Sequence, residues 1–307
     1  MSQPPGTDAR GPGDQAAHLR SVPFPHAAGT HWVATRDREV CLRLPYSRVV
    51  RAPDGAGVDP RAIMAILDHA CGAAMYAALE VPLPTATLEL RVAFQRPAPD
   101  GADILISART THVAGMTAFV EASASVEVGG PVLTSANGAF IVGAHPGGTS
   151  GQDLADPWQA PRAINVGDLS QLDSFDEFLG LTRTGSGLCM TFADRLIGAV
   201  SLPALHGGNV ASLLATAAGD LARQAQGSRE VARAQCTFVA DTFVAAISLL
   251  AHDPPPNLPN RPSCPLLNHR RTRANSAIDW YRPRRLPTPG ASMACWRPCV
   301  RMAGPCG

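Results

Sequence analysis

The sequence contains no lysine among its 307 residues. This absence excludes a Schiff base on a lysine amine, and it excludes a P-loop, which places a lysine beside the phosphates. Charged residues are few, at 17%, and the formal net charge is only +1. A nucleic acid or an anionic membrane surface is therefore not expected as a main partner.

Cys-x-x-Cys pairs and long apolar runs are also missing. The eight cysteines are scattered, so we expect reduced thiols in a cytoplasmic protein, with no metal and no redox cofactor. The longest apolar run, over residues 236–251, is too short to cross a bilayer and contains an aspartate. It is predicted to form a buried helix or a pair of strands, and no membrane span is expected.

The chain repeats itself at an offset of 147 residues. Residues 42–50, LRLPYSRVV, match residues 189–197, CMTFADRLI. Residues 59–72, DPRAIMAILDHACG, match residues 206–219, HGGNVASLLATAAG, without a gap. FQRP at 94–97 matches WYRP at 280–283 if the second copy holds an insertion. These matches indicate a tandem duplication of one domain.

Each copy is predicted to contain a strand, a loop, a long helix and then further strands. The first helix begins at Asp59-Pro60, a good N-cap followed by proline, and continues toward Ala78. Strands are expected over residues 85–94, 102–113, 117–128 and 134–143, and a short helix over 170–181. The predicted organisation is a disordered lead-in over 1–30, unit 1 over 31–145, a linker over 146–167, unit 2 over 168–290 with an insertion at about 225–274, and an irregular tail over 291–307.

The stretch LPALHGG raises the question of why an apolar helix begins with His206-Gly207-Gly208. Free N–H groups and the positive end of the dipole lie at a helix start, and glycines let a substrate carbonyl approach them. Such a start can act as an oxyanion hole. Hydrolysis also needs a carboxylate, as general base or as nucleophile. Asp68, in an apolar helical run, is the candidate.

Asp68 cannot belong to the same site as the N–H groups at the start of its own helix. Nine residues at about 1.5 Å each put it roughly 13 Å along that helix and on the opposite face. A complete site therefore needs Asp68 from copy 1 and the glycines from copy 2. The reverse pairing joins Asp59-Pro60-Arg61 with Ala215, and it has neither the acid nor the free amides. The sequence predicts one working site and one inactive site.

These residues resemble the hotdog-fold acyl-CoA thioesterases of the PaaI-like type, in a tandem, double-hotdog arrangement. The resemblance rests on HGG before an apolar helix, on an acid-bearing turn and on strands ending in xRP, and it covers about 35–290. It implies an α+β fold of two hotdog units, each a long central helix wrapped by a curved antiparallel sheet. The second unit is expected to be incomplete.

The resemblance also implies hydrolysis of an acyl-CoA to the free acid and coenzyme A, with coenzyme A present only as part of the substrate. Asp68 would activate water, the Gly207 and Gly208 amides would hold the thioester oxygen, and His206 belongs to the same motif. By alignment with the family, Thr87 falls where a hydroxyl orients the attacking water. A homo-oligomer of double-hotdog chains is possible.

Simpler interpretations stand beside these. His206 can be a helix cap or core histidine, Asp68-His69 a buried pair, Asp59 only an N-cap and Thr87 only a β-branched strand residue. A non-catalytic acyl-CoA-binding hotdog protein is the main alternative function. A hotdog hydratase is a third, although the spacing of Asp68-His69 does not fit it.

The end of the chain departs from the repeat. Residues 284–307 are rich in proline, arginine and cysteine and show no alternation. We hypothesise that the second sheet is truncated or read out of frame there. The basic cluster over residues 269–273 is interpreted as a solvated tail, with binding of coenzyme A phosphates as the alternative.

Overall fold

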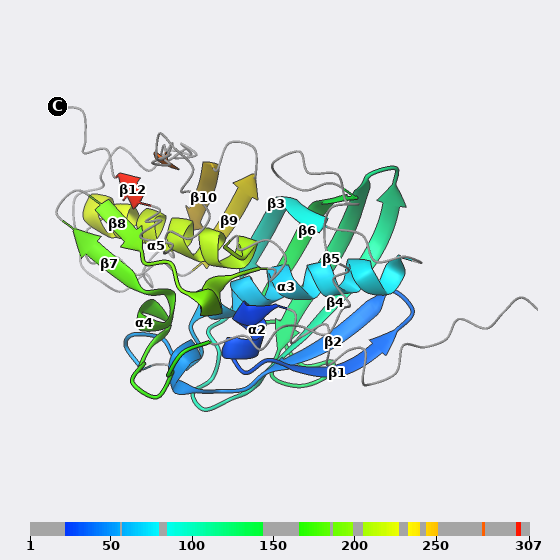
Figure 1. Ribbon diagram of the computed structural model, residues 1–307, viewed down its shortest axis with the longest axis horizontal. Coiled ribbons are helices and arrows are strands. Elements are labelled where there is room, and N and C mark those ends of the chain that lie inside the picture. The colour runs from blue at the N-terminus through cyan, green and yellow to red at the C-terminus, as the bar shows by residue number, and fades with distance from the viewer. Residues whose placement is uncertain are drawn as a thin grey trace, which may run out of the picture.

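The computed structural model describes residues 22–55, 57–79, 85–143, 166–184, 187–198, 205–226, 233–239, 244–250, 278–279 and 299–301, with side chains up to residue 220. Its centre is the long helix α3 (Pro60–Ala78), which lies across one face of an antiparallel sheet (Figure 1). This is the helix-in-sheet arrangement of the hotdog fold, and it makes the protein α+β.

The main sheet has eight strands, and most of them come from the first half of the chain. Its order is β1 (His31–Arg36), β2 (Glu39–Leu44), β4 (Ile104–Ala114), β5 (Thr117–Ser125), β6 (Thr134–Val142), β3 (Thr85–Phe94), β9 (Arg233–Val239) and β10 (Val244–Leu250). Burial alternates along β2, β5 and β6, so that one face of each strand packs on the core and the other faces solvent.

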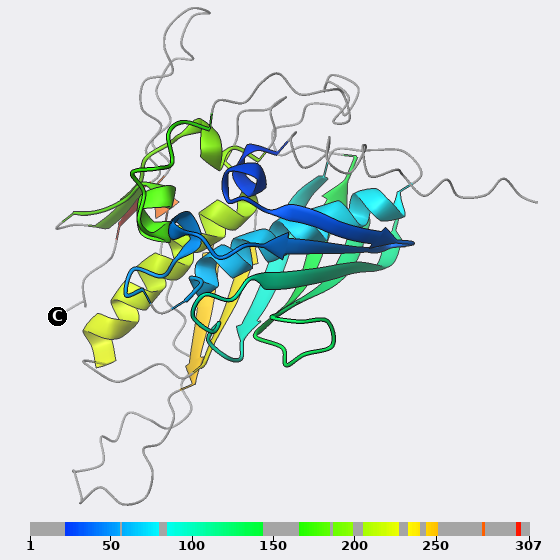
Figure 2. The same cartoon turned by 90° about the horizontal axis from the view of Figure 1, so that it is seen from below.

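Helix α3 begins where its sequence predicts. The Asp59 carboxylate accepts a hydrogen bond from the Arg61 N–H at 2.8 Å, and Pro60 occupies the first helical position. Residues 62–71 of the helix are buried without interruption. A helix that is buried on all sides needs partners on all sides. Strands β2 to β6 cover one side, and α5 (Gly207–Gln226) crosses the other (Figure 2).

The second half of the chain adds the elements beside α5. They are α4 (Phe175–Leu179), β7 (Leu181–Thr184), β8 (Gly187–Met190) and the 3₁₀ turn η3 (Asp194–Leu196). A smaller sheet has the order β11 (Ile278–Asp279), β12 (Cys299–Arg301), β8 and β7. The 3₁₀ turn η1 (Arg48–Val50) precedes α3 in the first half.

Most of the expected elements are confirmed. The helix from Pro60 to Ala78 and the strand over 85–94 have the expected bounds, and the other three strands of unit 1 agree to within a few residues. The apolar run over residues 236–251 covers the end of β9 and the whole of β10, so of its two predicted alternatives the strand pair is correct. Residues 146–165 of the linker expected over 146–167, and the basic cluster over 269–273, lie outside the described residues.

Four expectations need correction. Residues 23–27 of the lead-in form the helix α2 (Pro23–Ala27), because the apolar Phe24 is buried in the core. The expected insertion holds β9 and β10, since its apolar residues extend the main sheet, and the expected tail holds β12. Cys189 is disulfide-bonded. Cys41 and Cys71 are free, and none of the other cysteines is close to Cys189 in the sequence, the nearest being Cys236. Sequence spacing therefore gave no sign of this bond.

Candidate functional site

Asp68 lies near the middle of α3, 5% exposed, with a polar partner on the neighbouring sheet. The Thr87 hydroxyl, on β3, donates a hydrogen bond to Asp68 Oδ1 at 2.9 Å. Nothing in the packing of an apolar helix requires a buried carboxylate, and burying one is costly unless it is hydrogen-bonded. The structure thus joins two of the residues singled out in the sequence.

The start of α5 completes the cluster from the other half of the chain. A Cβ atom built on Gly207 would lie 3.0 Å from Asp68 Oδ2 and 3.3 Å from Thr87 Oγ1. The helix start therefore lies directly against the carboxylate. Within the described part of the chain, no acceptor is found for the Gly207 N–H, which leaves it as the candidate donor to a substrate oxygen.

Gly208 has a different role from Gly207. A Cβ atom on Gly208 would lie 2.6 Å from Ala65 Cα, so α5 crosses α3 at a distance that only glycine permits. Its N–H donates to His206 Nδ1 at 3.1 Å. The sequence reading gave both amides to the substrate. In the structure one amide already has an intramolecular acceptor.

His206 is buried immediately before α5. Its Nδ1 lies 3.6 Å from Asp68 Oδ2 and accepts the Gly208 N–H. A nitrogen that accepts a hydrogen bond carries no proton, so the remaining proton of a neutral ring lies on Nε2. The simpler view of His206 as a helix cap thus describes part of its geometry, because it satisfies one N–H of the first turn.

Burial shifts the two titratable groups of the cluster in opposite directions. It raises the pKa of Asp68, and this is only partly opposed by His206, by the Thr87 hydroxyl and by the Gly208 N–H. Burial lowers the pKa of His206, and the Asp68 charge partly opposes this. Both shifts disfavour the charged forms. A carboxyl with a raised pKa in a water-poor site is suited to accept a proton.

The reverse pairing predicted from the sequence, in which the start of α3 faces the middle of α5, contains no such cluster. Arg61, at the start of α3, donates to the Thr216 hydroxyl of α5 at 2.6 Å. The same guanidinium forms ion pairs with Asp59 at 2.5 Å and with Asp176 of α4 at 2.6 Å. At the positions that correspond to Gly207 and Asp68 at the offset of 147 residues, this pairing has Pro60 and Ala215. The sequence indicated that Arg61 lies in the reverse pairing, but not that it contacts Asp176 and Thr216, which are distant in sequence.

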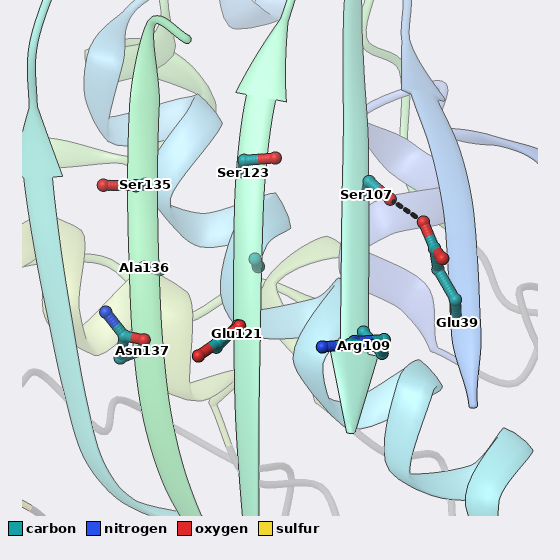
Figure 3. Close-up of a pocket in the computed structure, with 9 residues that line it drawn as sticks. Glu39, Ser107, Arg109, Glu121, Ser123, Ser135, Ala136 and Asn137 are labelled. Carbon is teal, nitrogen blue, oxygen red and sulfur yellow. Dashed lines mark hydrogen bonds between the residues drawn. The ribbon is translucent and has the colours of Figure 1, made fainter. Parts of the chain in front are cut away.

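A shallow depression on the opposite face of the sheet is unrelated to this cluster (Figure 3). Its floor is the row Ser107, Ser123 and Ser135, which pair across β4, β5 and β6. Ser107 donates to Glu39 at 2.6 Å. Small polar residues on the outer face of an antiparallel sheet are usual, so the depression is part of the solvated surface.

No metal site and no membrane-spanning helix is found among the described residues. No group of three His, Cys, Asp or Glu side chains there could hold a metal ion. None of the described helices is long and apolar enough to cross a membrane.

Residues 62–132 match the family model of the thioesterase superfamily. Among solved structures, the chain is similar to a thioesterase family protein from Silicibacter pomeroyi, at 20% identity, 43% of this chain, 98% of that chain and a TM-score of 0.39. It is also similar to the PaaI protein of E. coli from the phenylacetic acid degradation operon, at 13% identity, 45% of this chain, 94% of that chain and a TM-score of 0.38. No curated protein matches.

The matched segment includes α3 with Asp68, Thr87 on β3, and the strands that wrap the helix. The start of α5 lies outside it. Residues 62–132 are therefore the part of the chain that is similar to the thioesterase superfamily.

Proposed function

We propose that this protein is an acyl-CoA thioesterase with one composite site in each chain. The observation that carries the proposal is the contact between Asp68 of α3 and the start of α5, where Gly207 lies against the carboxylate. Thioester hydrolysis needs a base and a donor to the carbonyl oxygen. Here the base comes from the first half of the chain and the donor from the second.

The proposed reaction uses water as the nucleophile. The thioester carbonyl oxygen accepts a hydrogen bond from the Gly207 N–H. Asp68 takes a proton from water while the water oxygen forms a bond to the carbonyl carbon. Collapse of the tetrahedral intermediate breaks the C–S bond, and the thiol of coenzyme A leaves with the proton returned from Asp68. Thr87 holds Oδ1 of Asp68 and so leaves Oδ2, on the glycine side, for the water.

The tandem arrangement is part of the proposal, and the strand register supports it. Glu89 pairs with Val239, and Val92 pairs with Cys236. The repeat offset of 147 residues relates Glu89 to Cys236 and Val92 to Val239, so the two pairs exchange under the offset. This is the reciprocity expected when two related units join their sheets around a pseudo-two-fold axis.

The contacts between α3 and α5 also exchange under the offset of 147 residues. Gly208 lies against Ala65, and the Ser212 hydroxyl lies 3.2 Å from the Arg61 carbonyl oxygen. The offset relates Ala65 to Ser212 and Arg61 to Gly208. The same offset relates Asp68 to Ala215 and Gly207 to Pro60, so the counterpart of the Asp68 site has neither the carboxylate nor the glycine N–H, which supports a single working site.

The test is release of free thiol from a panel of short, long and aryl acyl-CoAs. The parent protein is compared with Asp68→Ala, Asp68→Asn and the matched control Asp59→Asn. Asp59 is an equally buried aspartate of the same helix, and asparagine preserves its N-cap. We expect turnover in the parent and in Asp59→Asn, and a loss of at least ~100-fold in both Asp68 variants.

The alternative function, a non-catalytic acyl-CoA-binding protein, predicts a different pattern. Such a protein would bind acyl-CoA in calorimetry equally well as parent and as Asp68→Asn, and it would release no thiol. Release from the parent that both Asp68 variants retain would contradict the role given to Asp68.

A further inference from the structure

A phenylalanine from the N-terminal segment covers the histidine of the composite site. The ring centroids of Phe24 and His206 are 4.9 Å apart, with the planes tilted by 41°. Phe24 is fully buried, and its ring also lies 6.1 Å from that of Phe178. Tilted aromatic pairs at such distances are favourable and fix the orientation of both rings.

The main chain ties α2 to the segment before the glycines. The Phe24 N–H donates to the Ile197 carbonyl at 3.3 Å. The neighbouring Leu196 carbonyl accepts the His206 N–H at 2.9 Å and the Asn209 side-chain amide at 3.1 Å. Helix α2, η3 and the start of α5 therefore form one hydrogen-bonded unit. In this unit Phe24 and His206 are linked through the main chain of residues 196 and 197.

The sequence of α2 suits it to hold a side chain in place. Pro23 and Pro25 flank Phe24, and each proline ring fixes its own φ. Two prolines in five residues reduce the freedom of the unfolded segment, so less entropy is lost when it packs. Phe24 is the one large apolar side chain of this segment that reaches the site.

We propose that Phe24 is a positioning residue for thioester hydrolysis. It holds the His206 ring where Nδ1 accepts the Gly208 N–H, 3.6 Å from Asp68 Oδ2. That bond fixes the first turn of α5, so Phe24 sets the direction of the adjacent Gly207 N–H. This inference rests on the proposed function, because positioning matters only if the Gly207 N–H binds a substrate oxygen.

The groups facing His206 define the pH behaviour to expect. Asp68 and His69 face it from α3, with 5.8 Å between the rings of the two histidines. From the other elements, α2 contributes the Phe24 ring and η3 contributes the Leu196 carbonyl. Removing the Phe24 ring opens the apolar side of His206 to water and so favours its protonated form. A protonated His206 cannot accept the Gly208 N–H, which links the ring contact to activity.

The experiment compares Phe24→Leu with the parent, using the full chain. Phe24→Tyr keeps the ring and serves as the conservative rescue. Phe175→Leu is the matched control, because Phe175 is equally buried and contacts Phe178 and Arg61 rather than His206. Two readouts are taken: kcat and KM of thiol release against pH, and NMR titration of the His206 ring. The His206 signal is assigned with His206→Gln.

In Phe24→Leu we expect kcat to fall about tenfold, less than the ~100-fold that a 1 Å misplacement can cause. KM should change by less than about twofold. The midpoint of the His206 titration and the acid limb of the rate profile should both move to higher pH. In Phe24→Tyr and in Phe175→Leu, kcat, the His206 titration midpoint and the acid limb should all stay close to the values of the parent.

The two readouts separate this proposal from the proposed function. A folded parent that releases no thiol would contradict the thioesterase, while the His206 titration would still test the contact with Phe24. An unchanged titration midpoint in Phe24→Leu would overturn the positioning role. The same shift in Phe175→Leu would also overturn it, because the effect would then come from general loosening.

Discussion

Gly208 and Ala65 are in backbone contact where the two long helices cross, and a Cβ atom on Gly208 would lie 2.6 Å from Ala65 Cα and 2.7 Å from its carbonyl oxygen. For a Cβ atom on the neighbouring Gly207, the three nearest atoms belong to the side chains of Asp68 and Thr87. Two consecutive glycines thus serve different ends. Gly208 allows α3 and α5 to approach closely, and Gly207 leaves space beside the Asp68 carboxylate.

Gly208→Ala should destabilise the fold. Its new methyl group meets backbone atoms that cannot move independently, and overpacking of this kind typically costs about 1–3 kcal/mol. Gly72→Ala is the control, because a Cβ at that helical glycine meets nothing within 4 Å. It should be neutral or stabilising by up to about 1 kcal/mol. Chemical denaturation of both variants checks this, and equal stabilities would contradict the close crossing.

Gly207→Ala should impair hydrolysis more than folding. The methyl group would lie 3.0 Å from Asp68 Oδ2 and 3.3 Å from Thr87 Oγ1, and these flexible groups can give way. Their displacement should lower kcat at least about tenfold, because the geometry of base and donor is disturbed. The melting temperature should stay close to that of the parent. A fully active Gly207→Ala would place the substrate elsewhere.

Replacing Thr87 should shift the pH dependence of hydrolysis in a direction that its hydrogen bond to Asp68 defines. Its hydroxyl helps to lower the pKa of Asp68 against the effect of burial. Thr87→Val removes the hydroxyl, so the pKa of Asp68 rises further, and the carboxylate becomes available as a base only at higher pH. The acid limb of the kcat profile should move to higher pH in Thr87→Val and return in Thr87→Ser. An acid limb that is the same in all three proteins would contradict the Thr87–Asp68 bond.

Local patterns in the sequence were enough to predict α3 and its wrapping strands. Asp59-Pro60 marks the start of the helix, and the alternation LELRVAF marks β3, because capping and burial act over a few residues. The partnership of Asp68 with the start of α5 also followed from the sequence. It came from comparing residues 59–72 with residues 206–219, because each segment has a part of the expected site that the other lacks.

The contacts that the sequence did not predict all depend on distant segments. Phe24 lies in a stretch rich in proline and glycine that is typical of disorder, and only packing against His206 and Phe178 reveals its place. The partners of Arg61 on α4 and α5 and the disulfide at Cys189 are likewise brought together by the fold. A strand pair was one of the two alternatives for residues 236–251, but its place in the main sheet was not predicted, because these residues were assigned to an insertion.

Asp68→Asn should be more stable than the parent near neutral pH, although we expect it to be inactive. Burial raises the pKa of Asp68 above 3.8, so ionising it costs more in the folded protein than in the unfolded chain. Below about pH 4, Asp68 is protonated in both the folded and the unfolded protein, so its ionisation does not lower the stability. Above its folded-state pKa, the full destabilisation is present. The gap in melting temperature should therefore open as the pH rises from 4 to 7. A gap independent of pH would contradict a buried carboxylate here.

Arg61→Met should destabilise the protein without lowering turnover per folded molecule. It leaves Asp59 and Asp176 without their shared cation, and breaking a mostly buried ion pair typically costs about 3 kcal/mol. Arg183→Met is the control, because Arg183 also pairs with Asp176 but is half exposed, and such pairs contribute about 1 kcal/mol or less. Urea denaturation gives both values. If Arg61→Met instead abolished thiol release at full stability, the working site would lie at the start of α3, and the assignment of the two sites would be reversed.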